Sequence, residues 1–179
     1  CISCHVVVNE AGDTLAGRNA KTGPNLYGIA GNAIGAVADF RYGNGIEKAN
    51  EMGLKPMAKY HRYQVAGVPP EIMGVGPAYS IPKLLDKTGM EKKDIELWEV
   101  NEAFASQALY CCEDVLELEM EKVNVNGGAI ALGHPLGCTG TFLTCKLLYE
   151  MERQDLRWGV VAMCIGGGMG AAGLFEREK

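Results

Sequence analysis

The 179-residue sequence lacks features that mark several specialised classes of protein. Its 17 Lys and Arg residues are outnumbered by 22 Asp and Glu residues, and no basic run is longer than Lys92–Lys93. This balance, with a net charge of −5, argues against a protein that binds the phosphate backbone of nucleic acids. The sequence begins without a basic and apolar leader, so we expect no signal peptide within it.

A convincing membrane span is also missing. Two stretches, Val123–Cys145 and Trp158–Phe175, carry no charged residue. The first contains Asn, His, Pro and Thr residues, which lipid disfavours, and six of the eighteen residues in the second are Gly. The turn-like run Ile165–Gly170 divides the second stretch into two short apolar segments, which favours buried strands. We therefore predict no membrane span.

The seven cysteines do not show the spacing of a secreted disulfide framework. Five of them follow residue 110 in apolar surroundings, as reduced cysteines of cytosolic proteins usually do. We therefore expect a cytoplasmic protein. Four of these cysteines are expected to be packing residues: Cys111, Cys112, Cys138 and Cys145.

Two regions of different character meet near residue 46. In residues 1–46, eight glycines interrupt every periodic run, whereas residues 47–179 alternate between apolar runs and helical spacing. This second region predicts an α/β fold. Its expected strands are 60–68, 95–100, 159–165 and 171–175, and its expected helices are 81–88, 104–116 and 142–151.

The sequence opens with Cys1-Ile2-Ser3-Cys4-His5, a CxxCH box. Two thiols at this spacing can attach haem while the neighbouring imidazole binds the iron, although a zinc half-site or coincidence would give the same letters. With the later segments 21–28 (KTGPNLYG) and 39–43 (DFRYG), residues 1–46 resemble the first part of cytochrome c2-type class I cytochromes c. The resemblance implies haem c on Cys1 and Cys4, His5 as the iron ligand, and Pro24 orienting that imidazole through its carbonyl.

The cytochrome resemblance stops before it is complete. That family places a methionine ligand well downstream, and no such motif follows here. About 46 residues cannot enclose a haem, so we expect no stable six-coordinate haem in this chain. A periplasmic c-type electron carrier is therefore the alternative hypothesis rather than the main one.

Five motifs lie in order along residues 47–179. They are Gly53–Pro56 (GLKP), Ile72–Pro77 (IMGVGP), Asn101–Phe104 (NEAF), Asn124–Pro135 (NVNGGAIALGHP) and Cys164–Gly168 (CIGGG). Together they resemble the C-terminal half of a thiolase, a family that exchanges acyl groups between 3-oxoacyl thioesters and coenzyme A. The resemblance implies a thiolase-like C-terminal half, a mixed sheet with helices, and coenzyme A as a substrate with no bound cofactor.

Thiolase chemistry needs a thiolate nucleophile, a base, a proton donor for the departing carbanion, and donors aimed at the thioester oxygen. By resemblance, His134 activates the nucleophile and forms one oxyanion hole, in which Asn101 holds a water. Cys164 acts as the acid/base cysteine, and the N–H of Gly166 contributes to a second oxyanion hole. From the residues alone, Asn101 also suits a helix N-cap and Cys164 a buried, inert thiol.

The thiolase nucleophile has no match in this sequence, because that motif belongs to the N-terminal half of the family. We therefore expect the chain to be inactive alone, with another chain supplying the missing half within a homo- or hetero-oligomer. Acyl-CoA and coenzyme A are the expected ligands. Two further possibilities stay open: a non-catalytic partner subunit, and a chimeric sequence assembled from two proteins.

Overall fold

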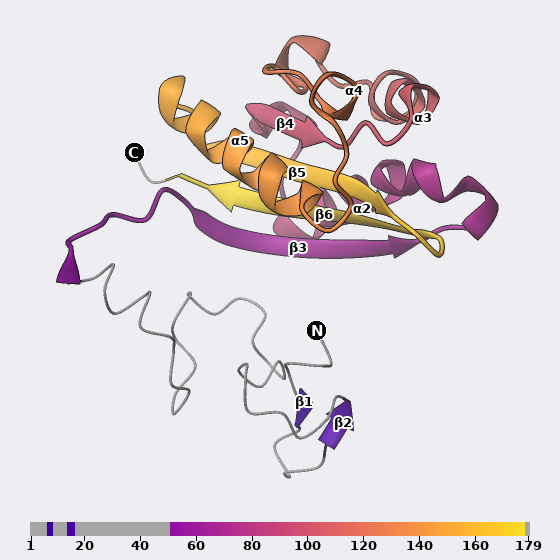
Figure 1. The fold of residues 1–179 in the computed structure, drawn as a ribbon, viewed down its shortest axis with the longest axis horizontal. Coiled ribbons are helices and arrows are strands. Elements are labelled where there is room, and N and C mark those ends of the chain that lie inside the picture. Colours follow the sequence, from indigo (N-terminus) through magenta and orange to yellow (C-terminus); the bar gives the residue numbers. More distant parts are fainter. Residues whose placement is uncertain (1–6, 9–13, 17–50, 178–179) are drawn as a thin grey trace. The chain divides into compact units, whose positions relative to one another are not determined.

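The computed structural model describes residues 7–8, 14–16 and 51–177 (Figure 1). The chain divides into two units, Cys1–Pro56 and Met57–Lys179. In the first unit, β1 (Val7–Val8) pairs antiparallel with β2 (Thr14–Ala16). The expected boundary at residues 46–47 and the whole CxxCH box lie outside the described residues, so the division into 1–46 and 47–179 stays a prediction.

The second unit is built on a four-stranded mixed sheet in the order β3-β6-β5-β4. Its strands are β3 (Lys59–Gly67), β4 (Leu97–Val100), β5 (Trp158–Ile165) and β6 (Met169–Glu176). β4 and β5 run parallel, whereas β6 is antiparallel to both of its neighbours. The four predicted strands, and the α/β class, are confirmed.

One face of the sheet is covered by α2 (Gly76–Thr88), which follows the 3₁₀ segment η1 (Pro70–Val75). Ile81, Leu84 and Leu85 recur at helical spacing and are all buried, which is why this helix packs on the sheet. The helix ends at Gly89, whose φ of 68° is the left-handed conformation that glycine adopts at little cost. The apolar cluster on this face consists of Ile81, Leu84, Leu85, Ile95, Trp98, Val100, Cys112, Leu116, Leu118, Val123, Val160, Ala162, Ala172 and Leu174.

The opposite face is covered by α5 (Thr139–Arg153), which lies in front of the sheet in Figure 1, while α2 lies behind it. This confirms the helix predicted over 142–151. Gly159 allows the close approach of α5, because a Cβ there would stand 2.7 Å from Met151 Sδ and 2.9 Å from Leu147 Cδ1. The smaller cluster on this face consists of Leu97, Leu143, Leu147, Met151 and Val161.

The single helix predicted over 104–116 is wrong in its geometry. The structure has a short α-helix, α3 (Ala105–Leu109), followed by a π-helix, η3 (Tyr110–Val115). The bond from the N–H of Leu116 to the carbonyl of Cys111 spans five residues and closes the wider turn. Apolar residues every three or four positions suit either kind of helix, so the periodicity could not distinguish them.

Three short helical segments complete the unit: η2 (Lys92–Asp94), η4 (Met120–Lys122) and α4 (Ala129–Leu132). Within the part of the chain that the structure describes, no helix has the length and apolarity needed to cross a membrane.

Candidate active site

Two of the expected site residues lie at the carboxyl ends of neighbouring parallel strands. Asn101 directly follows β4, is fully buried, and donates its backbone N–H to the carbonyl of Ala162 on β5 at 2.9 Å. Cys164 lies on β5, two residues beyond Ala162. The carboxyl edge of a sheet is where α/β proteins commonly bind ligands.

His134 comes to this edge from a loop between α4 and α5. Its Nε2 atom lies 3.4 Å from Nδ2 of Asn101, although the two residues are 33 positions apart in sequence. Its Nδ1 atom lies 2.7 Å from Oγ1 of Thr139, the first residue of α5. His134 is exposed, so a ligand can reach the imidazole from outside. The structure thus brings together His134 and Asn101.

Cys164 lies at the same end of the sheet but on its other face. Side chains alternate along a strand, so Cys164 shares the side of Ala162, which belongs to the α2 cluster. Met163 points the other way, toward the start of α5, where its Cε is 3.3 Å from a Cβ built on Gly140. Among the described residues, no hydrogen bond joins the thiol of Cys164 to His134 or Asn101. Convergence of all three on one pocket stays a prediction.

Burial sets the ionisation of the thiols on the α2 side. It raises the pKa of Cys164 above the ordinary thiol value, with a hydrogen bond from its own backbone opposing the rise. Burial likewise raises the pKa of Cys112 to about 12. A thiol of this kind stays protonated near neutral pH, which suits a proton donor better than a nucleophile.

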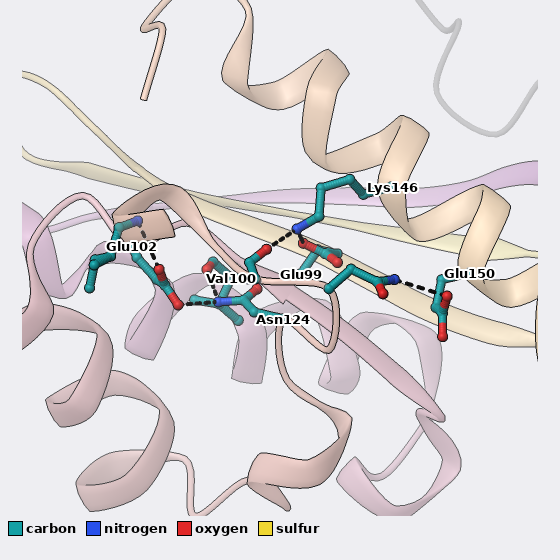
Figure 2. A network of polar contacts seen from close by, with 9 residues as sticks. Glu99, Val100, Glu102, Asn124, Lys146 and Glu150 are labelled. Atoms are coloured by element: carbon teal, nitrogen blue, oxygen red, sulfur yellow. Dashed lines mark hydrogen bonds and ion pairs between the residues drawn. The ribbon is translucent and has the colours of Figure 1, made fainter. Parts of the chain in front are cut away.

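A carboxylate at the end of β4 fastens the loop that leads to His134 (Figure 2). Glu102 accepts the backbone N–H of Ile130 at 3.0 Å and the side-chain N–H of Asn124 at 3.1 Å. The Asn124 amide also bonds both backbone groups of Val100, at 2.9 and 2.8 Å. A Cβ on Gly128 would collide with the Glu102 carboxylate, which explains the second glycine of the NVNGG motif.

Two side chains of α5, Lys146 and Glu150, hold the same loop from the other side. Lys146 lies 2.7 Å from the buried Glu99 and also donates to the carbonyl of Gly127. Burial raises the pKa of Glu99, while the hydrogen bond from Lys146 opposes that rise. Glu150 accepts a bond from Asn126 at 2.9 Å (Figure 2). The loop therefore has contacts to both β4 and α5.

The turn after Asn101 is closed by Gln107. This buried side chain donates to the carbonyl of Asn101 and accepts the N–H of Phe104, both at 3.3 Å. The N-cap of α3 is Phe104 rather than Asn101, so the N-cap interpretation of Asn101 is wrong. The Oδ1 atom of Asn101 is buried and has no partner among the described residues, so it can accept a donor from a ligand.

Of the four cysteines that were expected to be packing residues, two are buried and two are exposed. Cys111 and Cys112 are buried, as packing residues should be, but Cys138 and Cys145 are exposed in this unit, so that prediction is wrong for both. Cys138 is the N-cap residue before α5 and Cys145 lies on an exposed side of that helix, so their apolar sequence surroundings did not imply burial. Gly166 lies exposed in the β5–β6 turn, with open space where a Cβ would be.

The haem and metal predictions are not addressed by this geometry. Cys1, Cys4, His5 and Pro24 all lie outside the described residues. Between residues 51 and 177, no group of three or more His, Cys, Asp or Glu side chains is arranged to hold a metal ion.

Sequence reasoning gave no role to Glu102, Gln107, Asn124 or Thr139. Glu102 lies inside the NEAF motif and Asn124 inside the NVNGG motif, and these motifs were the signal that could have identified both residues.

Comparisons with known proteins agree with this geometry. Residues 54–177 match the family described as the thiolase C-terminal domain. The 3-ketoacyl-CoA thiolase of Bacillus subtilis is 59% identical over 130 residues, which are 73% of this chain and 33% of that protein. A peroxisomal 3-ketoacyl-CoA thiolase 1 of Arabidopsis thaliana is 46% identical over 173 residues, 96% of this chain and 36% of that protein. This longer alignment necessarily reaches into residues 1–46.

Solved structures give the same result. Human mitochondrial 3-ketoacyl-CoA thiolase in complex with CoA superposes with a TM-score of 0.69 and 44% identity, over 74% of this chain and 34% of that one. The dimeric peroxisomal thiolase of Saccharomyces cerevisiae gives a TM-score of 0.67 and 55% identity, over 73% and 33% respectively. The chain thus spans about a third of the length of the proteins it matches.

Proposed function

The chain belongs to the thiolase family, and from this premise we propose that it supplies the acid/base half of an acyl-CoA C-acyltransferase. The observation that carries the proposal is the approach of His134 to Asn101, with Cys164 on the adjacent strand. An imidazole, an amide and a protonated thiol at one edge of a sheet are the groups that this reaction needs besides its nucleophile.

The proposed reaction is thiolytic cleavage of a 3-oxoacyl-CoA, or its reversal. His134 takes the proton of a nucleophilic thiol supplied from outside this chain, and the thiolate attacks the 3-oxo carbon. The bond between the second and third carbons breaks, leaving an acyl thioester on the nucleophile and the carbanion of acetyl-CoA. Cys164 protonates that carbanion. Free coenzyme A then gives its thiol proton to the Cys164 thiolate and attacks the acyl thioester. This releases the shortened acyl-CoA, and the freed nucleophile regains its proton from His134.

The environment of each residue supports its role. Burial raises the thiol pKa of Cys164, so the thiol carries the proton that the carbanion must receive. Once His134 has taken the thiol proton, its Nε2–H can donate to the thioester oxygen, and the unpaired Oδ1 of Asn101 suits a water that donates there as well. The backbone N–H of Gly166, two residues beyond Cys164, is the proposed donor to the second oxyanion.

The proposed ligands are acyl-CoA and coenzyme A, since one solved relative contains CoA. The proposed partner is a chain carrying the remaining half of a thiolase, within an oligomer of the kind shown by the dimeric yeast protein. A cytoplasmic location stays a prediction, because the named relatives include bacterial and peroxisomal proteins.

The haem hypothesis for Cys1, Cys4, His5 and Pro24 also stays a prediction. No described residue bears on it, and no reaction step is assigned to haem. Thioether-linked haem in the purified chain, with His5 on the iron, would establish it. The further assignment of residues 1–46 to a cytochrome-like segment depends on the same measurement.

Complementation tests the main proposal. The full chain is co-expressed with the part of the Bacillus subtilis thiolase that it does not match, and thiolysis of a 3-oxoacyl-CoA is measured. We expect activity from the purified complex, hereafter the complemented enzyme, and none from the chain alone. Cys164→Ser should lower the rate by about 100-fold or more, whereas the exposed Cys145→Ser should leave it unchanged. Failure to form the complex, or a complex without activity, contradicts the proposal.

A further inference from the structure

Thr139 occupies a position that links the imidazole of His134 to the start of α5. It is 2% exposed, and its hydroxyl oxygen has two neighbours within hydrogen-bonding distance. One is Nδ1 of His134 at 2.7 Å, and the other is the carbonyl oxygen of Pro135 at 3.0 Å. The same carbonyl accepts the backbone N–H groups of Cys138 and Thr139, so the turn fixes its position.

The bond between Thr139 and Pro135 determines the role that the hydroxyl plays toward His134. A hydroxyl group has one proton to donate, and a carbonyl oxygen can only accept. The structure directs the Thr139 hydroxyl proton at the Pro135 carbonyl, so the hydroxyl oxygen presents a lone pair to His134. The tautomer that matches this lone pair carries its proton on Nδ1, the ring atom that faces the hydroxyl oxygen.

The other side of the ring requires the same arrangement. Nε2 of His134 faces Nδ2 of Asn101, an amide nitrogen that can only donate. Nε2 must therefore present its lone pair. A single chain of donors and acceptors runs from Asn101 through both ring nitrogens and Thr139 to the carbonyl of Pro135.

We infer that Thr139 is a positioning residue that holds neutral His134 as the Nδ1–H tautomer and leaves Nε2 able to accept a proton. The inference rests on the proposed function, since it assigns the proton-accepting atom of the proposed base. It also gives α5 a function beyond packing, because the first residue of that helix sets the orientation of the ring. Catalytic imidazoles depend on such partners for the correct tautomer.

Nitrogen-15 NMR of the full chain tests the tautomer directly. The chain contains three histidines, and His134→Gln identifies the His134 signals. Spectra are recorded along a pH series up to the pH at which the ring signals no longer change, so that the rings are neutral. We expect the proton on Nδ1 in the native chain and in Thr139→Ser, which keeps the hydroxyl. Thr139→Val has the same shape without that hydroxyl, and we expect it to shift the ring toward the Nε2–H tautomer.

The native spectrum alone can overturn the inference: a ring protonated on Nε2 contradicts it, whether or not the valine variant folds. An unchanged tautomer in a folded Thr139→Val chain contradicts it as well.

A second measurement separates this inference from the proposed function. In the complemented enzyme, Thr139→Val should lower kcat by about 10- to 100-fold with little change in KM, and Thr139→Ser should restore kcat. A complemented enzyme that is inactive with Thr139 intact contradicts the proposed function but does not affect the assignment of the tautomer, which the NMR spectra test. An active enzyme whose kcat is indifferent to Thr139→Val contradicts the inference alone.

Discussion

The two faces of the sheet are packed by different means. The α2 face is an almost entirely apolar cluster that includes Trp98, whereas the α5 face combines a smaller cluster with the buried ion pair Glu99–Lys146. Cys164 lies on the first face and the pair Asn101–His134 is joined to the second. Burial on the apolar face raises the thiol pKa of Cys164, whereas on the polar face the first residue of α5, Thr139, contacts the imidazole of His134.

The largest effect is expected on the apolar face. Trp98 is 2% exposed at the centre of the α2 cluster, so Trp98→Ala removes a large side chain and leaves a cavity. We expect the free energy of unfolding to fall by about 3–5 kcal/mol. Urea denaturation followed by circular dichroism measures this. A loss below about 1 kcal/mol would mean that this face does not carry the stability of the unit.

A comparable but pH-dependent effect is expected on the polar face. Lys146→Met leaves the Glu99 carboxylate buried without its partner, which costs about 3 kcal/mol near pH 8. The pKa of Glu99 is already raised in the folded chain and should rise further without the lysine. A raised carboxyl pKa favours the folded state at low pH, so stability falls as pH rises, and the cost should shrink at pH 5.

The matched control for this prediction is the double variant Glu99→Gln, Lys146→Met, which removes both charges. It should be more stable than Lys146→Met at pH 8 and should lose the pH dependence. Equal stability of the single variant at pH 5 and pH 8 would show that Glu99 is not the group responsible.

Glu150 should show the opposite pH dependence, with a smaller magnitude. Hydrogen bonds from Arg153 lower its pKa to about 2, with Gln154 and Asn126 adding to the effect. A carboxyl group whose pKa is lower in the folded state stabilises the fold at pH values above its unfolded pKa. This stabilisation is lost as the pH falls toward 2. Because Arg153 is largely exposed, Glu150→Gln should cost about 1 kcal/mol at pH 7 and clearly less near pH 2, where the carboxyl is about half protonated. Denaturation curves at both pH values check this.

The smallest effect is expected at the exposed thiols of the α5 segment. Cys145→Ser should change the free energy of unfolding by less than about 0.5 kcal/mol, because the side chain is exposed in this unit. Cys112→Ser, on the buried face, should cost about 1–3 kcal/mol through an unpaired hydroxyl. Equal losses in the two variants would remove the contrast between buried and exposed cysteines.

Much of this arrangement could be predicted from the sequence. The strands and the two long helices follow from apolar spacing and from glycine at their ends, as at Gly89. The π-helix at Tyr110–Val115 could not be predicted, because apolar spacing does not show to which carbonyl each backbone N–H is bonded. The exposure of Cys145 could not either, because an apolar neighbourhood in sequence does not say which side of a helix meets the sheet.

The site was predictable in part. His134, Asn101 and Cys164 were selected by resemblance to a family, not by spacing, since 33 residues separate the first two. The residues that position them, Glu102 and Thr139, could not be predicted from the sequence, for a physical reason. The contacts of Glu102 and Thr139 depend on how a loop returns to β4 and where α5 begins, which residue types alone do not specify.

Proton exchange at the α-carbon tests the central claim most directly. The complemented enzyme is incubated with acetyl-CoA in D₂O, and deuterium entering the acetyl methyl group is followed by mass spectrometry. If Cys164 is the acid/base group, Cys164→Ser should slow the exchange by about 100-fold or more, while Cys145→Ser leaves it unchanged. Exchange that continues at the native rate in Cys164→Ser would contradict the assignment of this chain as the acid/base half of a thiolase.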